Sequence, residues 1–286
     1  MATAINDSAQ DYCAGLVRTY DRDRYFSTLF ASAEKRPALI SLYAFNIEIT
    51  RIRDAVSEPP LGEIRLQWWR EEINGIYQDR AGNQPVIQAL APVIRDARLP
   101  EETFQNLIDA RTFDLYDDPM PTLNDLEGYL GETSSALFQL AAMILTGNDA
   151  RTAATASGNA GIAYGLTGLL RELPKMRARG QCYLPKDILT DTGSSPAHIL
   201  SGRWEKKEQA AINALCNTAR EHLDAARALC KDIPDRALPA FLPCALIEDD
   251  FRQLQERGLN PLKDTARAGR LNRQWRILRA AATKRF

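Results

Sequence analysis

The sequence predicts an all-α protein that forms one domain, and three observations favour this fold class. Apolar residues recur at three- and four-residue steps along most of the chain, which is the period of an amphipathic helix. The period-two alternation of a half-buried strand is absent. We also find no internal repeat or low-complexity linker that would divide the chain. We therefore expect residues 1–286 to form a single helical domain.

The first half of the chain predicts three helices. In the first, apolar residues share one face: Leu42, Phe45, Ile49, Ile52 and Val56. Pro59-Pro60 should end that helix, and residues 61–77 should form the next. Thr122 with Asp125 resembles a helix start, and the following apolar run continues to Leu145.

The second half predicts a long amphipathic helix over residues 203–231, with Ala, Leu and Cys on one side. Gly193-Ser194-Ser195-Pro196 is typical of a loop between helices. Asn260-Pro261 then precedes a basic terminal helix.

Four glycines fall on one face of a further predicted helix: Gly158, Gly161, Gly165 and Gly168. Each glycine costs about 1 kcal/mol relative to alanine inside a helix, so a face without side chains must serve a structural or functional purpose. Close packing against another helix and a ligand lying against the backbone are both compatible with it.

Composition excludes several classes of function. A net charge of -1 gives no electrostatic case for nucleic acid. The longest apolar run, residues 137–145, is too short to cross a bilayer, so membrane contact should be at most peripheral. The first residues lack the basic and apolar regions of a secretory signal. Five cysteines without close pairing disfavour a zinc site or a disulfide framework, so we expect reduced packing residues in a cytoplasmic protein.

Several blocks, in order, resemble the squalene/phytoene synthase family over nearly the whole chain. They are the flap-like Arg24-Tyr25-Phe26-Ser27, the first motif helix at 42–54, the helix at 66–72, the second motif at 169–176, and Arg179-Gly180-Gln181-Cys182-Tyr183-Leu184-Pro185. The resemblance implies the isoprenoid synthase fold, with helices around a central cavity. It also implies a set of cavity and flap residues: Ser27, Tyr43, Gly161, Gly165 and Tyr183.

In active members of that family, two motifs face each other and their carboxylates hold Mg²⁺, which neutralises a prenyl diphosphate. The first motif usually ends in Asp-Asp-x-x-Asp, but here it reads Thr50-Arg51-Ile52-Arg53-Asp54. Only Asp54 can still supply a carboxylate there.

The second motif departs in the same way. Glu172 replaces the first aspartate, and Lys175 and Met176 stand where the family carries acids. Thr50, Arg51, Asp54, Arg171, Glu172 and Lys175 are therefore interpreted as the remnant of a diphosphate and metal site. We expect no metal or other cofactor. If Mg²⁺ is bound after all, Asp54 and Glu172 would hold it.

A narrower, non-catalytic branch of the family has similar departures. Phe45-Asn46-Ile47-Glu48 and Thr133-Ser134-Ser135 resemble the branch that contains a mitochondrial respiratory complex I assembly factor. The resemblance implies a complex I subunit or assembly intermediate as partner. It also implies a place at the inner membrane, on the matrix side in a eukaryote.

Three functions remain open. The first is a pseudoenzyme that assists assembly of NADH:ubiquinone oxidoreductase (complex I). The second is an active prenyltransferase acting on farnesyl or geranylgeranyl diphosphate, in which cations neutralise the diphosphate directly. The third is a non-catalytic binder of a lipid or isoprenoid in the inherited cavity.

Other candidate sites favour structural explanations. The acidic segments 114–118 and 248–250 are interpreted as solvated. His222 has no partner at metal-ligand spacing, and Trp68-Trp69 should place one ring in the core and the other near the surface. The basic terminal helix is interpreted as solvated, with contact to anionic lipid or a partner as the alternative.

Overall fold

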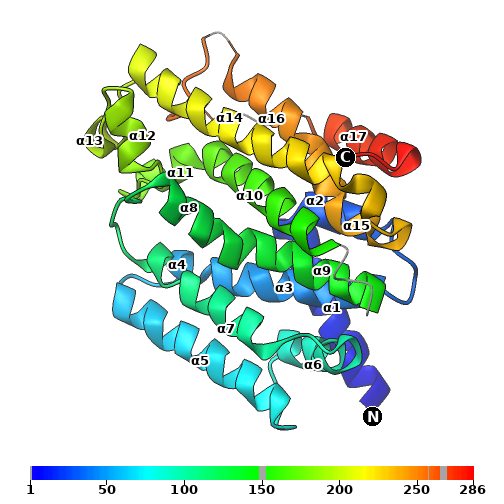
Figure 1. Ribbon diagram of the computed structural model, residues 1–286. Coiled ribbons are helices and arrows are strands. Elements are labelled where there is room, and N and C mark those ends of the chain that lie inside the picture. Colours follow the sequence, from blue (N-terminus) through cyan, green and yellow to red (C-terminus); the bar gives the residue numbers. More distant parts are fainter. Residues whose placement is uncertain (1, 148–152, 257, 265–268) are drawn as a thin grey trace.

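The computed structural model describes residues 2–147, 153–256, 258–264 and 269–286. Within them, every regular element is a helix (Figure 1). The predicted all-α fold is confirmed. In the described part of the chain, no helix combines the length and the apolar character needed to cross a membrane.

The helices before the centre of the chain are α1 (Ala2–Tyr20), α2 (Arg22–Thr28), α3 (Arg36–Thr50), α4 (Ile52–Ala55), α5 (Pro59–Tyr77), α6 (Pro85–Ala97), α7 (Glu101–Ala110), α8 (Leu123–Leu130) and α9 (Ala136–Thr146). The later helices are α10 (Ala154–Arg171), α11 (Leu173–Ala178), α12 (Lys186–Asp191), α13 (Pro196–Ser201), α14 (Lys206–Ala228), α15 (Leu238–Phe241), α16 (Ile247–Leu254) and α17 (Arg270–Thr283). A π-helical turn, Gly131–Ser135, joins α8 to α9.

Helix α10 lies at the centre of the molecule, with α14 on one side and α8 and α9 on the other (Figure 1). Helices α5, α6 and α7 form one end, and α16 and α17 lie at the opposite end (Figure 1). One large cluster of buried apolar side chains connects most of these helices, whereas α17 packs on Leu242 and Leu246 in a smaller cluster. Helices α3 and α10, each of which carries part of one motif, contribute many buried side chains to the large cluster.

The first predicted helix is wrong in one respect: it breaks before Val56. Helix α3 ends at Thr50, and the chain restarts in α4 at Ile52 after Arg51. Pro59 and Pro60 do not merely stop a helix. They occupy the first turn of α5, where a missing N–H costs nothing because it would have no partner inside the helix.

Two other predictions about helices and packing are confirmed. The hydroxyl of Thr122 accepts a hydrogen bond from the Asp125 N–H at 3.1 Å and begins α8. Trp69 is buried, whereas the side chain of Trp68 is 39% exposed.

The described cysteines behave as packing residues. Cys13, Cys182, Cys216 and Cys244 are buried and free. Burial raises the pKa of the Cys182 thiol to about 11, so this group stays protonated at neutral pH. His222 also has a structural role, because its ring contacts Asn159 Oδ1 at 2.9 Å and Glu127 Oε1 at 3.3 Å.

The glycine face of α10 serves close packing at its centre. A Cβ at Gly161 would lie 2.2 Å from the Cα of Ser135, so only glycine lets the π-helical turn approach. The Ser135 hydroxyl donates to the Gly158 carbonyl at 2.7 Å across the same contact. A Cβ at Gly158 or Gly168 would meet nothing within 4 Å. Close packing therefore requires glycine at only some of these positions.

The prediction that residues 248–250 form a solvated face is wrong. Asp249 and Asp250 are buried, with 5% and 1% of their surface exposed. Asp250 pairs with Arg171 at 3.1 Å and with Arg273 of α17. Arg273 also pairs with Asp23 of α2 at 2.7 Å. A buried carboxylate needs such partners, and the partners come from distant parts of the chain.

Candidate functional site

A cavity of about 540 Å³ lies between the two motif regions. Its walls come from α3, α4, α8, the π-helical turn, α10, α11 and the segment after α11. Eight of the residues predicted for the site line it: Thr50, Arg51, Asp54, Gly165, Arg171, Glu172, Lys175 and Tyr183. The fold thus brings the two motif remnants to one cavity.

Three residues expected at the cavity are not among those that line it. Ser27 is fully buried, and its hydroxyl donates to the Asp23 carbonyl at 2.8 Å within its own helix. Tyr43 is buried beneath Arg24, whose guanidinium lies 5.5 Å from the ring centroid. Gly161 lies against Ser135. In this structure, packing within the helical layer already occupies these three residues.

Asp54 is the central contact between the two motifs. Its Oδ2 lies 3.0 Å from the Lys175 Nζ, and its Oδ1 pairs with Arg179. Asp54 comes from α4, whereas the two cations come from the end of α11 and the residue after it. The acid of the first motif therefore meets cations from the second motif region directly.

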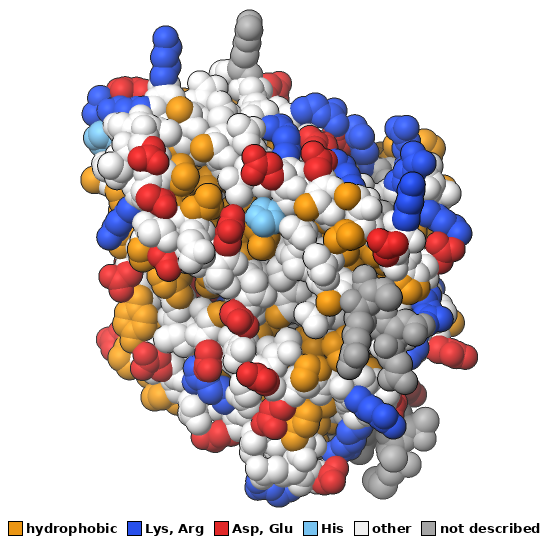
Figure 2. All heavy atoms as spheres, in the orientation of Figure 1, with side chains coloured by type: hydrophobic (Ala, Val, Ile, Leu, Met, Phe, Trp, Pro, Cys, Tyr) orange, Lys and Arg blue, Asp and Glu red, His pale blue; other side chains and the backbone are white. Residues whose placement is uncertain are grey.

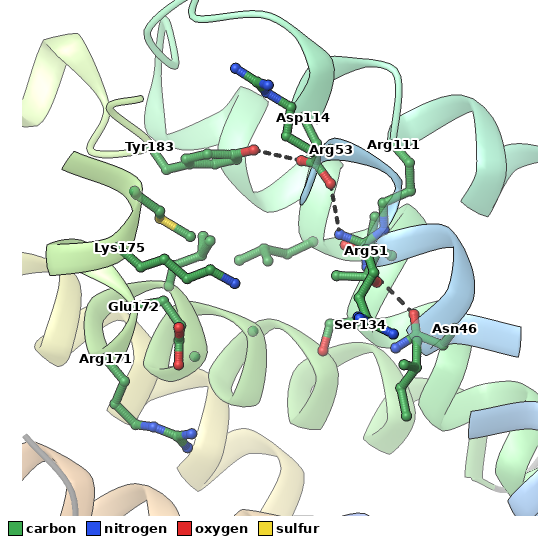
Figure 3. A pocket seen from close by; sticks show the side chains of 18 of the residues that line it. Asn46, Arg51, Arg53, Arg111, Asp114, Ser134, Arg171, Glu172, Lys175 and Tyr183 are labelled. Atoms are coloured by element: carbon green, nitrogen blue, oxygen red, sulfur yellow. Dashed lines mark hydrogen bonds and ion pairs between the residues drawn. The ribbon is translucent and has the colours of Figure 1, made fainter. Parts of the chain in front are cut away.

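These residues do not fit the Mg²⁺ cluster that the fold family implies. Both oxygens of Asp54 are occupied by cations, and Lys175 extends into the cavity from α11 (Figure 3). Among the described residues, no group of three or more His, Cys, Asp or Glu side chains is placed to hold a metal ion. Divalent cations need several oxygen ligands, and neighbouring ammonium and guanidinium groups repel them.

The cations of the first motif are engaged differently. Arg51 stacks on Tyr20, with 3.8 Å between its guanidinium carbon and the ring centroid. Within the described chain, no carboxylate lies in ion-pair range of Arg51. Arg53 pairs with Asp117 at 3.6 Å.

Arg171 belongs to the buried ion-pair network more than to the cavity centre. Its Nη1 donates to Asp250 at 3.1 Å, and its side chain points away from Lys175 and Arg51 (Figure 3). The predicted role in binding a diphosphate does not match this orientation, because Asp250 holds the guanidinium below α10.

The opposite wall of the cavity carries a polar cluster around Asp114. The hydroxyls of Tyr129 and Tyr183 each donate to Asp114 Oδ1 at 2.6 Å. Arg111 donates to Asp114 Oδ2 at 3.2 Å and reaches toward Asn46 (Figure 3). Burial and the neighbouring Asp114 carboxylate raise the pKa of Tyr183, so its hydroxyl remains a donor.

This cluster corrects the interpretation of residues 114–118 as solvated for Asp114, whereas Asp117 and Asp118 are exposed as predicted. Asp114 is largely buried, with 13% of its side chain exposed, because a cation and two hydroxyls replace its water shell. The acidic character of the segment was visible in the sequence, but its partners Arg111 and Tyr129 were not.

A second buried cation of the site, Arg24, was also not predicted from the sequence. Arg24 pairs with Asp21 at 2.8 Å, and its guanidinium lies 4.7 Å from the ring centroid of Tyr164. Arg24 belongs to the flap-like block Arg24-Tyr25-Phe26-Ser27, and the resemblance of that block was the sequence feature that could have identified it.

The cavity is lined by more cations than acids. Seven basic side chains line it: Arg24, Arg51, Arg53, Arg111, Arg171, Lys175 and Arg179. Four acids accompany them: Asp21, Asp54, Asp114 and Glu172. Such a lining favours an anion over a metal cation.

Comparison with known proteins places these features in a family. The sequence model of squalene/phytoene synthase matches residues 17–276. "NADH dehydrogenase (ubiquinone) complex I, assembly factor 6" of Bos taurus is 32% identical, covering 86% of this chain and 73% of the relative. Its homolog in Dictyostelium discoideum is 26% identical over 85% of this chain and 69% of the relative. Phytoene synthase 1 of Arabidopsis thaliana is 24% identical over 76% of this chain and 53% of the relative.

Solved structures agree on the fold. A dehydrosqualene synthase in complex with a ligand has a TM-score of 0.87 at 15% identity, covering 99% of this chain and 98% of that one. The squalene synthase HpnC from Alicyclobacillus acidocaldarius has a TM-score of 0.75 at 22% identity, covering 89% and 98%. The predicted isoprenoid synthase fold is confirmed.

Proposed function

The chain belongs to the squalene/phytoene synthase family, and we propose that it is a non-catalytic member that assists assembly of respiratory complex I, NADH:ubiquinone oxidoreductase. The contact of Asp54 with Lys175 and Arg179 carries the first half of this proposal, because it puts an ion pair where the family's chemistry needs metal-bound carboxylates. Relatives named as complex I assembly factors, similar over most of the chain, support the second half.

The proposed partner is a complex I subunit or an assembly intermediate. Since complex I lies in a membrane, the expected place of action is its inner-membrane surface: the cytoplasmic side in a bacterium and the matrix side in a mitochondrion. The role needs a stable surface and no chemical step. A helical fold with one extensive buried core supplies such a surface.

A turnover assay tests the loss of catalysis. The purified chain is mixed with Mg²⁺ and farnesyl or geranylgeranyl diphosphate, and diphosphate release is measured. We expect none above the rate without protein. Release that disappears in both Asp54→Ala and Glu172→Ala would overturn the proposal, because it would assign those acids to a working metal site.

Deletion with complementation tests the assembly role. Loss of the gene should lower NADH:ubiquinone oxidoreductase activity and leave subcomplexes on a native gel. The wild-type chain should restore both, and so should Asp54→Asn and Glu172→Gln, because neither carboxylate has a catalytic task. Normal complex I without the gene contradicts the proposal. Failure of both acid variants, at normal protein levels, would instead favour catalysis.

A second candidate function is metal-free binding of an isoprenoid or other lipid. The cavity of about 540 Å³ favours it, since side chains do not fill the inherited site and Arg51 has no carboxylate partner within the described chain. Native mass spectrometry of the purified protein tests it directly. A lipid mass that is lost when the cavity is filled by substitution would support this function.

A further inference from the structure

Helix α17 exposes an apolar stripe that the fold does not cover. Leu271, Trp275 and Leu278 are 81%, 63% and 43% exposed. They follow each other at steps of four and three residues, so they lie on one side of the helix. We call these three residues the α17 stripe.

The other side of the same helix is held firmly by the protein. Ile277 and Ala280 are buried against Leu242 and Leu246, and Arg273 is tied to Asp23 and Asp250. The stripe therefore points outward from an anchored helix. Adjacent exposed apolar side chains on an anchored helix indicate a surface that contacts a partner protein or a membrane.

The charged residues of α17 itself all have one sign. Residues 270–286 contain no acid. Arg270 and Arg279 lie next to the ends of the stripe in sequence and flank it on the helix. In the described part of the chain, neither these two side chains nor Arg285 has a carboxylate in ion-pair range. Lys and Arg side chains gather at this end of the molecule (Figure 2).

We propose that the α17 stripe and its flanking arginines dock the protein on a lipid surface that contains anionic phospholipid. Trp275 and the two leucines would enter the boundary between head groups and acyl chains, where an indole ring is favoured. Arg270 and Arg279 would contact lipid phosphates beside them. This is peripheral binding, and it agrees with the lack of a helix suited to span a membrane among the described residues.

A second apolar stripe on α5 shows why the charges matter. Leu61, Ile64 and Trp68 are 48%, 66% and 39% exposed at similar helical spacing. Glu63 and Glu71 lie beside them, and so does Arg65. Mixed charge gives no preference for an anionic surface, so α5 supplies a matched control at the other end of the molecule.

Vesicle co-sedimentation with the full chain tests the proposal. One set of vesicles is phosphatidylcholine alone, and the other is phosphatidylcholine mixed with phosphatidylglycerol. We expect binding to the mixed vesicles that weakens as salt rises. Trp275→Ala with Leu278→Ala should lower the partition coefficient by about tenfold or more, because each side chain loses its burial in lipid. Arg270→Gln with Arg279→Gln should lower it by about fivefold for each cation, on anionic vesicles only.

Ile64→Ala on α5 is the matched control and should bind like the wild type. Circular dichroism checks that every variant is folded, which is expected because all substituted side chains are exposed or at the surface. A blue shift of tryptophan emission on adding vesicles should be present in the wild type and absent in Trp275→Phe.

Three outcomes would overturn the proposal. The first is wild-type binding by Trp275→Ala with Leu278→Ala. The second is an equal loss in Ile64→Ala. The third is lack of vesicle binding by the wild type, which would leave a protein partner as the occupant of the stripe. The vesicles contain no complex I, so failure here leaves the proposed assembly role standing, and failure of that role leaves vesicle binding unaffected.

Discussion

At the scale of single residues, Asp54 is the acid of the first motif, and its carboxylate contacts cations from the second motif region. Its two oxygens contact Lys175 and Arg179 from another helix region. The pair closes the same gap between motifs that metal ions would bridge in an active member. An ion pair neutralises the Asp54 carboxylate within the protein, so under the proposed non-catalytic role the contact links the two motif regions and prepares no reaction.

We expect Asp54→Ala to lower the free energy of unfolding by less than about 1 kcal/mol, because Asp54 and Lys175 are 34% and 54% exposed and water screens the pair. Mg²⁺ should not raise the melting temperature of the wild type. Thermal unfolding with and without Mg²⁺ measures both. Arg203→Ala, which removes the exposed Arg203–Glu205 pair and leaves Glu205 at the start of α14, is the control. A Mg²⁺-dependent rise in the wild type that Asp54→Ala lacks would contradict the loss of the metal site.

The glycines of α10 allow a second test at this scale. Gly161→Ala should destabilise the protein by about 1–3 kcal/mol, because its Cβ would collide with the backbone of Ser135. Gly158→Ala, three residues earlier on the same helix, should be neutral or stabilising by up to about 1 kcal/mol, because its Cβ meets open space. Urea unfolding of both variants decides the matter. Equal effects would show that the turn does not pack on Gly161 as described.

At the scale of elements, a buried ion-pair network joins helices that are far apart in sequence. Asp250 of α16 contacts Arg171 at the end of α10 and Arg273 of α17, and Arg273 reaches Asp23 of α2. The network holds the outermost helix in place. It also directs the Arg171 guanidinium away from Lys175 and Arg51, so one set of contacts positions α17 and shapes the site.

Asp250→Ala should cost about 3–5 kcal/mol, because it removes the carboxylate acceptor of the buried Arg171 guanidinium and one of the two carboxylates that hold Arg273. Asp224→Ala removes one of the partners of Arg227, from a position that is 73% exposed, and should cost less than about 1 kcal/mol. Urea unfolding followed by circular dichroism measures the difference. A cost for Asp250→Ala no larger than that for Asp224→Ala would mean that the network contributes little to the attachment of α17.

At the scale of the whole molecule, the cavity and the surface offer different routes to function. An assembly role that depends on the surface does not need the cavity, whereas lipid binding inside the fold does. The two ends of the molecule also differ, since α17 carries an apolar stripe with cations and α5 carries one with mixed charge. Surface and cavity can therefore be altered separately.

Leu169→Trp places a larger side chain into the cavity wall and reduces the space available to a ligand. We expect complementation of complex I assembly to remain at the wild-type level, because the proposed role does not use the cavity. Complex I activity in the deletion strain measures this. Thermal unfolding checks that the variant folds, and Ile64→Ala is the surface control. Loss of complementation by Leu169→Trp alone, in a folded protein, would favour the ligand-binding function.

The helices and the loss of the metal acids could be read from the sequence because both depend on local information. Helical period, the Thr122 cap and the Pro59-Pro60 boundary are properties of neighbouring residues. The residue type at each motif position is also read directly from the sequence. Thr50 and Lys175 cannot supply carboxylates wherever they lie.

Only the tertiary structure decided which charges meet. Asp54 and Lys175 are 121 positions apart, and Asp250 and Arg171 are 79 apart. Asp114 and Asp250 were expected to be solvated because each lies in a short acidic segment. Asp114 is instead a buried acceptor for the distant Tyr183, and Asp250 is one for Arg171. The free energy of a charged group depends on its surroundings in space, and packing between helices determines those surroundings.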